Sequence, residues 1–193
     1  MLKIDTHAHY LPRDWPDLAG KYGDNRFPVI HHGDDGRHRI YKDGKFFREI
    51  WPKTWDPQIR IDDYAGFGVQ VQVLSTVPVM FSYWAKPQHA HDLHQALNDH
   101  MAEALRDYPR HYAGIGTVPL QSPRLAIQEL ERCMDQLGLQ GGARRRRQIG
   151  QLLGKQVLQH RDGGGMHGPP RYLMSGPVSK PGEDRGGPAT AHS

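Results

Sequence analysis

Two histidines near the N-terminus, His7 and His9, have the residue type and the spacing of a metal-binding pair. They follow Asp5 at the end of a short apolar run, in the stretch MLKIDTHAHYLP. On a β-strand, residues i and i+2 point to the same face, and imidazole is a common zinc ligand. However, the chain has 13 histidines in 193 residues, so one H-x-H pair is about what chance would give. The spacing alone therefore leaves a metal site and a pair of ordinary surface histidines equally open.

A second H-x-H pair, His89 and His91, is followed closely by His94. These residues fall where we expect a helix to start. In a helix, positions i and i+2 lie on different faces, so His89 and His91 do not converge, whereas His91 and His94 share a face. A solvated helix start is the preferred interpretation, with a metal site as the alternative.

The elements that must position these residues alternate between strands and helices. Strands are predicted over 2–7, 69–78 and 111–119, and helices over 56–67, 90–108 and 123–137. The pair Asp56-Pro57 marks one helix start, and Gly138 marks one helix end. Such alternation favours a parallel sheet of βαβ units. The order is that of the first units of a (β/α)₈ barrel, which takes ~250 residues in full.

A small inserted domain is expected over about 13–55, between the first strand and the first helix. Most of this segment is rich in glycine and charge. Within it, residues 38–50 contain two runs with β-forming residues on either side of Asp43-Gly44, a strong turn signal. The sequence therefore predicts a β-hairpin that projects from the barrel-like part.

Composition restricts the class of protein. The hydrophobic fraction is 37%, no apolar run approaches a membrane span, and one cysteine excludes an intrachain disulfide framework. The N-terminus lacks the pattern of a signal peptide. We therefore expect a soluble protein of the cytoplasm, with no membrane partner.

The composition changes near Gly141. Residues 1–140 carry a net charge of −2, whereas residues 141–193 carry +6, and glycine and proline supply 17 of those last 53 residues. We expect this tail to be mostly disordered, with a short helix near 148–159. The run Arg144–Arg147 attracts phosphates, but no aromatic residues interleave with it, so we expect no nucleic-acid partner.

The stretches KIDTHAHYLPRDWPDL, WDPQIRIDDYAGFGVQVQVLSTVPVMFSYWAKP and DYPRHYAGIGTVPLQSPRLAIQELERCMDQLG closely resemble a decarboxylase family. The family acts in tryptophan breakdown and belongs to the amidohydrolase superfamily of metal-dependent (β/α)₈ barrels. The resemblance implies that His7 and His9 are zinc ligands. It further implies that Arg48, in the hairpin, binds a carboxylate of a small-molecule substrate. Arginine suits this role because its planar fork pairs with carboxylates bidentately. From spacing alone, Arg48 is equally an exposed hairpin arginine.

The resemblance ends at about residue 140. The family continues into further strands that carry a third histidine ligand, an aspartate ligand and an acid/base histidine, and we assign none of these here. A reading-frame change or an alternative exon would produce such a switch. We therefore expect a barrel truncated after about three βα units, with impaired decarboxylation and no catalytic acid/base retained. The family forms homodimers, so the alternative is a non-catalytic fragment that binds the full-length enzyme.

Overall fold

The chain forms one parallel sheet and one smaller antiparallel sheet. The computed structural model describes residues 1–144 and 174–175. Within these residues, the parallel sheet has the strand order β1 (Ile4–His9), β5 (Val71–Ser75), β6 (Tyr112–Thr117), β7 (Gly142–Arg144) and β8 (Met174–Ser175). Every neighbouring pair is parallel, so the carboxyl ends of the strands lie at one edge of the sheet.

Three helices follow the strands in the order that the sequence predicts. They are α2 (Pro57–Ala65), α3 (Pro87–Asp107) and α4 (Pro123–Asp135). Each begins with proline, which has no N–H to leave unsatisfied at a first helical position. The Asp56 carboxylate caps α2 by accepting from the backbone N–H of Ile59 at 2.9 Å. The helix α3 begins before its predicted start at Ala90, because Pro87 opens it.

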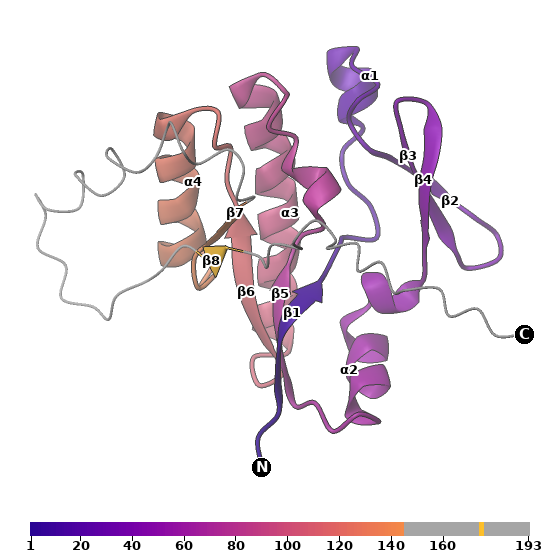
Figure 1. The fold of residues 1–193 in the computed structure, drawn as a ribbon, viewed down its shortest axis with the longest axis vertical. Helices are drawn as coiled ribbons and strands as arrows, with labels where there is room; N and C mark the ends of the chain where they lie inside the picture. The colour runs from indigo at the N-terminus through magenta and orange to yellow at the C-terminus, as the bar shows by residue number, and fades with distance from the viewer. Residues whose placement is uncertain (145–173, 176–193) are drawn as a thin grey trace, which may run out of the picture.

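The α3 and α4 helices lie side by side along one face of the parallel sheet, whereas α2 lies apart from them, beside β1 (Figure 1). These βα units confirm the predicted fold class of a barrel-type α/β protein with an insertion.

The sheet also continues past residue 140, where we place the end of the barrel-like part. Gly142 pairs with Gly116 of β6, and three residues are too few to give a strand signal in the sequence. The predicted tail helix lies outside the described residues.

The insertion forms a three-stranded antiparallel sheet of β2 (Val29–His32), β3 (His38–Lys42) and β4 (Lys45–Ile50), preceded by the short helix α1 (Leu18–Tyr22). Two 3₁₀ turns, Pro52–Thr54 and Pro78–Phe81, follow β4 and β5. The predicted hairpin is confirmed, and its turn has φ of 55° at Asp43 and 67° at Gly44, as a two-residue hairpin turn requires. The strand β2 and the helix α1 were not predicted from the sequence, because they are only four and five residues long.

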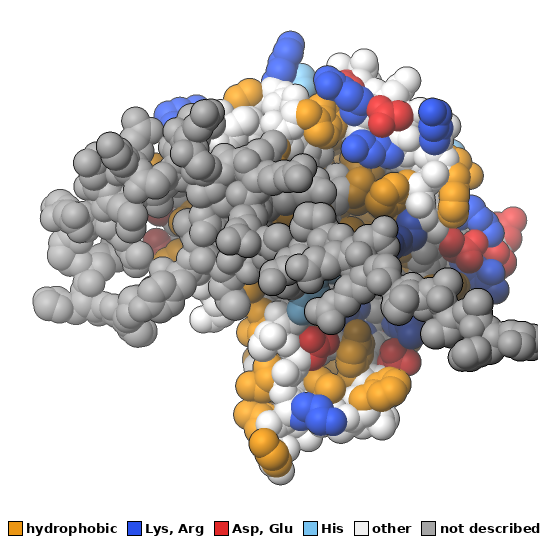
Figure 2. Space-filling view, in the orientation of Figure 1, with side chains coloured by type: hydrophobic (Ala, Val, Ile, Leu, Met, Phe, Trp, Pro, Cys, Tyr) orange, Lys and Arg blue, Asp and Glu red, His pale blue; other side chains and the backbone are white. Residues whose placement is uncertain are grey.

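The inserted sheet packs on the rest of the chain through a shared hydrophobic core. Ile40 and Ile50 face inward and are buried with Leu11, which follows β1, and with Leu93 of α3. Figure 2 shows the opposite surface of the inserted sheet at the right-hand edge of the molecule, where basic and acidic side chains gather. There Arg37 and Arg39 pair with the carboxylates of Asp35 and Glu49 at 3.0–3.2 Å. The inner face is therefore the one that meets the barrel-like part.

Among the described helices, none is long and apolar enough to cross a membrane.

Candidate functional site

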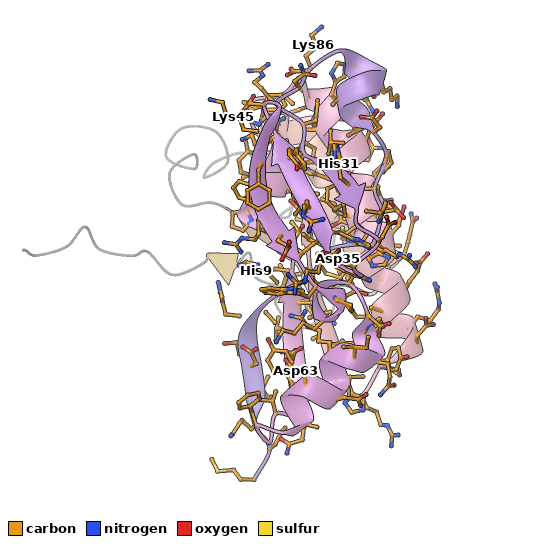
Figure 3. The ribbon with its side chains drawn as sticks, turned by 90° about the vertical axis from the view of Figure 1, so that its right-hand side faces the viewer. His9, His31, Asp35, Lys45, Asp63 and Lys86 are labelled. Carbon is orange, nitrogen blue, oxygen red and sulfur yellow. The ribbon has the colours of Figure 1, made fainter. Side chains whose placement is uncertain are left out.

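The two histidines of the first strand stand at its carboxyl end, beside the inserted sheet. Figure 3 shows His9 where β1 meets the end of the three-stranded sheet, whereas Lys45, at the start of β4, lies at the far end of that sheet. The register between β1 and β5 shifts between Asp5 and Ala8. Such an irregularity re-aims side chains next to functional sites. The ring centres of His7 and His9 lie 4.9 Å apart, and the two rings are arranged edge to face.

This spacing fits one shared metal ion. Two imidazoles that bind one ion through Zn–N bonds of about 2.1 Å have ring centres roughly 4.6–5.3 Å apart, for N–Zn–N angles between about 90° and the tetrahedral value. Burial, followed by the nearby His7 ring, lowers the pKa of His9 below its ordinary value. The neutral imidazole is the form that binds a metal. The Ser75 Oγ atom lies 3.5 Å from the Nδ1 atom of His9. The donor chemistry and the geometry of His7 and His9 therefore suit a divalent transition metal.

Asp5 does not complete the pair. Its Oδ1 atom accepts from the backbone N–H of His7 at 3.0 Å, and its Oδ2 atom accepts from the Gln72 side-chain amide at 3.0 Å. No group of three or more His, Cys, Asp or Glu residues suited to a metal occurs in the part of the chain that the structure describes. Among the described residues, His7 and His9 therefore remain a pair of candidate ligands without a third, and Asp5 is bonded to His7 and Gln72 instead.

Arg48 lies on β4, opposite Ile40 in the register of the inserted sheet. Residues directly opposite in an antiparallel pair share a face, so Arg48 lies on the inner side with Ile40 and Ile50. Its side chain is exposed, and its guanidinium lies 6.0 Å from the Phe47 ring centre. Within residues 1–144, no carboxylate lies within ion-pair distance of Arg48, unlike Arg39 on the outer face. An arginine on this side is therefore available to an acidic ligand.

The second histidine cluster is not at a solvated helix start, and that prediction was wrong. His91 and His94 are 3% and 0% exposed. The face of α3 that carries them packs on α4 and on the 3₁₀ turn Pro78–Phe81. The His91 Nε2 atom lies 3.1 Å from the Glu129 carboxylate, and the His94 Nε2 atom lies 2.9 Å from the Phe81 carbonyl oxygen. His89 instead stacks on Tyr22 of α1 at 3.5 Å. The three histidines point to different partners, so the structure does not bring them together.

The arginine run lies almost entirely beyond the described residues. The backbone of Arg144 ends β7, and residues 145–147 lie outside the part of the chain that the structure describes. The expectation of no nucleic-acid partner stays a prediction.

Two buried polar residues behind the histidine pair were not predicted from the sequence. Arg60 of α2 and Gln72 of β5 are 5% and 3% exposed. They hydrogen-bond to each other, with Arg60 Nε 2.9 Å from Gln72 Oε1. In the sequence VQVQVL, Gln72 alternates with valines, and this pattern is typical of a residue that faces solvent. Only the packing of α2 against that face reveals that both are buried.

Histidines at the carboxyl end of a strand, in a fold of parallel βα units, stand where barrel enzymes build their active sites. The sequence pattern of the amidohydrolase family matches residues 4–170, so the chain belongs to this family, as its resemblance implied. The match continues beyond residue 140, the expected end of the resemblance.

Two curated relatives share a name. The 2-amino-3-carboxymuconate-6-semialdehyde decarboxylase of Dictyostelium discoideum is 49% identical over 140 residues, covering 72% of this chain and 39% of that protein. The protein of the same name from Caenorhabditis elegans is 34% identical over 180 residues, covering 83% of this chain and 43% of that protein. The chain therefore spans about two fifths of the length of these relatives.

A solved structure confirms the fold. It is the dihydroxybenzoic acid decarboxylase of Polaromonas sp. JS666, with bound manganese and the inhibitor 2-nitroresorcinol. It superposes with a TM-score of 0.51 at 24% identity, over 74% of this chain and 37% of that one.

Proposed function

We propose that this chain carries the metal-binding and carboxylate-binding part of a decarboxylase that acts on 2-amino-3-carboxymuconate-6-semialdehyde, in the kynurenine pathway of tryptophan breakdown. One observation carries the proposal. A histidine pair with the spacing of shared metal ligands stands beside a sheet whose inner face presents an arginine without a carboxylate partner among the described residues. The relatives named for this reaction supply the substrate class.

His7 and His9 would hold a divalent metal, which supplies a Lewis acid and lowers the pKa of a bound water. We propose zinc, as the family resemblance implies, although the Polaromonas structure contains manganese. Imidazole ligands suit both ions. The Arg48 guanidinium would pair with a substrate carboxylate and orient it toward the histidine pair. The substrate is a small acidic molecule, and a carboxylate is the group that a planar guanidinium fork binds best.

The chain alone is expected to decarboxylate this substrate only near the limit of detection. A catalytic zinc usually has three protein ligands, and the described residues supply two. Proton transfer by a positioned side chain contributes typically 10²–10⁴-fold, and no such residue is assigned here. Robust turnover by the 193-residue chain would contradict this expectation. Capture of a full-length relative without turnover would instead support the alternative of a non-catalytic binding partner.

The experiment joins residues 1–144 to the remaining sequence of the Dictyostelium relative and follows the disappearance of the semialdehyde with zinc or manganese present. We expect the joined protein to decarboxylate it. Arg48→Lys should raise KM by roughly 10- to 100-fold, because lysine replaces a bidentate, charge-assisted pair with a single point charge. The matched control is Arg39→Lys, on the outer face of the same hairpin. An equal effect of the two substitutions, or no turnover by the joined protein, would reject the proposal.

A further inference from the structure

Arg60 connects three separate segments around the histidine pair. Its Nη2 atom donates to the backbone carbonyl of His9 at 2.8 Å, and its Nη1 atom donates to the carbonyl of Lys53 at 2.7 Å. Its Nε atom donates to the side chain of Gln72 at 2.9 Å. One guanidinium therefore bonds to the end of β1, to the turn that follows β4, and to the second residue of β5.

The contact with Gln72 extends to the other histidine. The Gln72 amide donates to Asp5, and the second oxygen of Asp5 accepts from the backbone N–H of His7. Arg60 thus holds His9 directly and His7 through two side chains. Because Lys53 lies in the turn directly after β4, the same guanidinium also sets where the inserted sheet with Arg48 stands relative to the pair.

The energetic cost of Arg60 argues that its geometry matters. It is 5% exposed, and no carboxylate of the described residues lies within ion-pair distance of it. Its charge is instead met by neutral acceptors and by the rings of Tyr10 and Tyr64, at 5.9 and 5.4 Å. A buried charge without a counter-ion is expensive, and an apolar residue of similar volume is often the more stable choice. Only an arginine fork donates in three fixed directions at once.

We infer that Arg60 is a positioning residue, which fixes the separation between the His7–His9 pair and the inserted sheet that carries Arg48. The inference rests on the proposed function for the identity of the site. In this role Arg60 contacts neither the metal nor the substrate. Its action passes through two backbone carbonyls and through the Gln72–Asp5 connection.

The test uses the full chain and cobalt(II), whose visible absorption reports the coordination of the ion. Arg60→Met should weaken cobalt binding by about 10-fold or more, the loss typical when a group that orients a metal ligand is removed. Arg60→Lys should not restore it, because one ammonium cannot replace three fixed donors. Gln72→Met removes the connection to Asp5 and the acceptor of the Arg60 Nε–H, but it keeps the bonds from Arg60 to His9 and Lys53. It should therefore give a smaller loss, which tests the proposal even if Arg60→Met fails to fold.

The matched control is Arg132→Met, which removes another largely buried arginine, bonded to Glu129 and Asp99 on α4 and α3. It should lower the urea midpoint at least as much as Arg60→Met, with the cobalt affinity and spectrum unchanged. Wild-type cobalt affinity and spectrum in both Arg60→Met and Gln72→Met would overturn the inference. A loss of affinity in Arg132→Met equal to that in Arg60→Met would also overturn it, because stability alone would then explain the effect.

Amide hydrogen exchange separates this inference from the proposed function. The backbone N–H of Tyr10 donates to Ser75, and that of Leu11 donates to Thr54, next to the carbonyls that Arg60 holds. Arg60→Met should accelerate exchange at Tyr10 and Leu11 and leave α4 unchanged. If the wild-type chain binds no cobalt but this local effect appears, the metal proposal fails while the positioning role stands. Exchange that accelerates equally in α4 would reject the positioning role.

Discussion

The carboxylate of Glu129 on α4 lies 3.1 Å from the Nε2 atom of His91 on α3, and both side chains are buried. Glu129 also accepts from the Asn98 amide at 2.7 Å and from the Arg132 guanidinium at 2.7 Å. Burial alone would raise the pKa of Glu129, but the bonds from Arg132 and Asn98 outweigh it and lower that pKa. The carboxylate is therefore the centre of a polar network that joins the two helices.

Glu129→Ala should destabilise the fold by about 3 kcal/mol or more, because it removes the buried carboxylate that Arg132, Asn98 and His91 share. Urea unfolding of the two chains measures the loss. The control is Glu131→Ala, two residues along α4, whose side chain is exposed. Equal midpoints for the two variants would contradict a structural role for Glu129.

His94 should make stability depend on pH in the weakly acidic range. Burial lowers its pKa from the ordinary 6.5 to about 4. Between these values the unfolded chain binds a proton that the folded chain does not, so stability falls as pH falls from about 6.5 to about 4. The contribution of this one group is roughly 3 kcal/mol. Urea unfolding at pH 7 and pH 4.5 should show a smaller loss for His94→Gln than for the wild type. An identical loss in both chains would show that His94 is not the group responsible.

The sequence identified the elements that have local signals. Pro57 with its Asp56 cap, and the Asp43-Gly44 turn, carry their conformation in two or three neighbouring residues, and both elements were confirmed. The short strands β2 and β7 were missed, because three or four residues give no periodicity.

Burial of polar residues was the main thing that the sequence did not reveal. Each buried polar residue has a partner that lies far away in the sequence. His91 is buried against Glu129, and Arg60 donates to the carbonyl of His9. Residue type favoured solvent for each of them, and only packing between distant segments places them inside. For the same reason the candidate metal pair was proposed from its place on a strand end, whereas the groups that hold that strand were found only in the fold.

The hairpin turn supplies a matched glycine comparison. Gly44 has φ of 67°, in the left-handed region, and nothing crowds its Cβ position. Gly66, after α2, has φ of −58° and meets its nearest neighbour at 3.5 Å. Gly44→Ala should therefore cost about 1 kcal/mol from backbone strain, whereas Gly66→Ala should be neutral or slightly stabilising. Thermal unfolding of both variants gives the comparison, and a larger loss at Gly66 would be inconsistent with this turn geometry.

The central claim is that His7 and His9 supply two ligands of a divalent-metal site. A zinc titration of the full chain in a calorimeter tests this claim most directly. The comparison is among the wild type, His7→Ala/His9→Ala, and the control His31→Ala/His32→Ala, which removes two exposed histidines of the inserted sheet. We predict weak zinc binding by the wild type and by the control, and loss of that binding in His7→Ala/His9→Ala. Zinc binding by His7→Ala/His9→Ala as tight as that of the wild type would contradict the assignment of the pair.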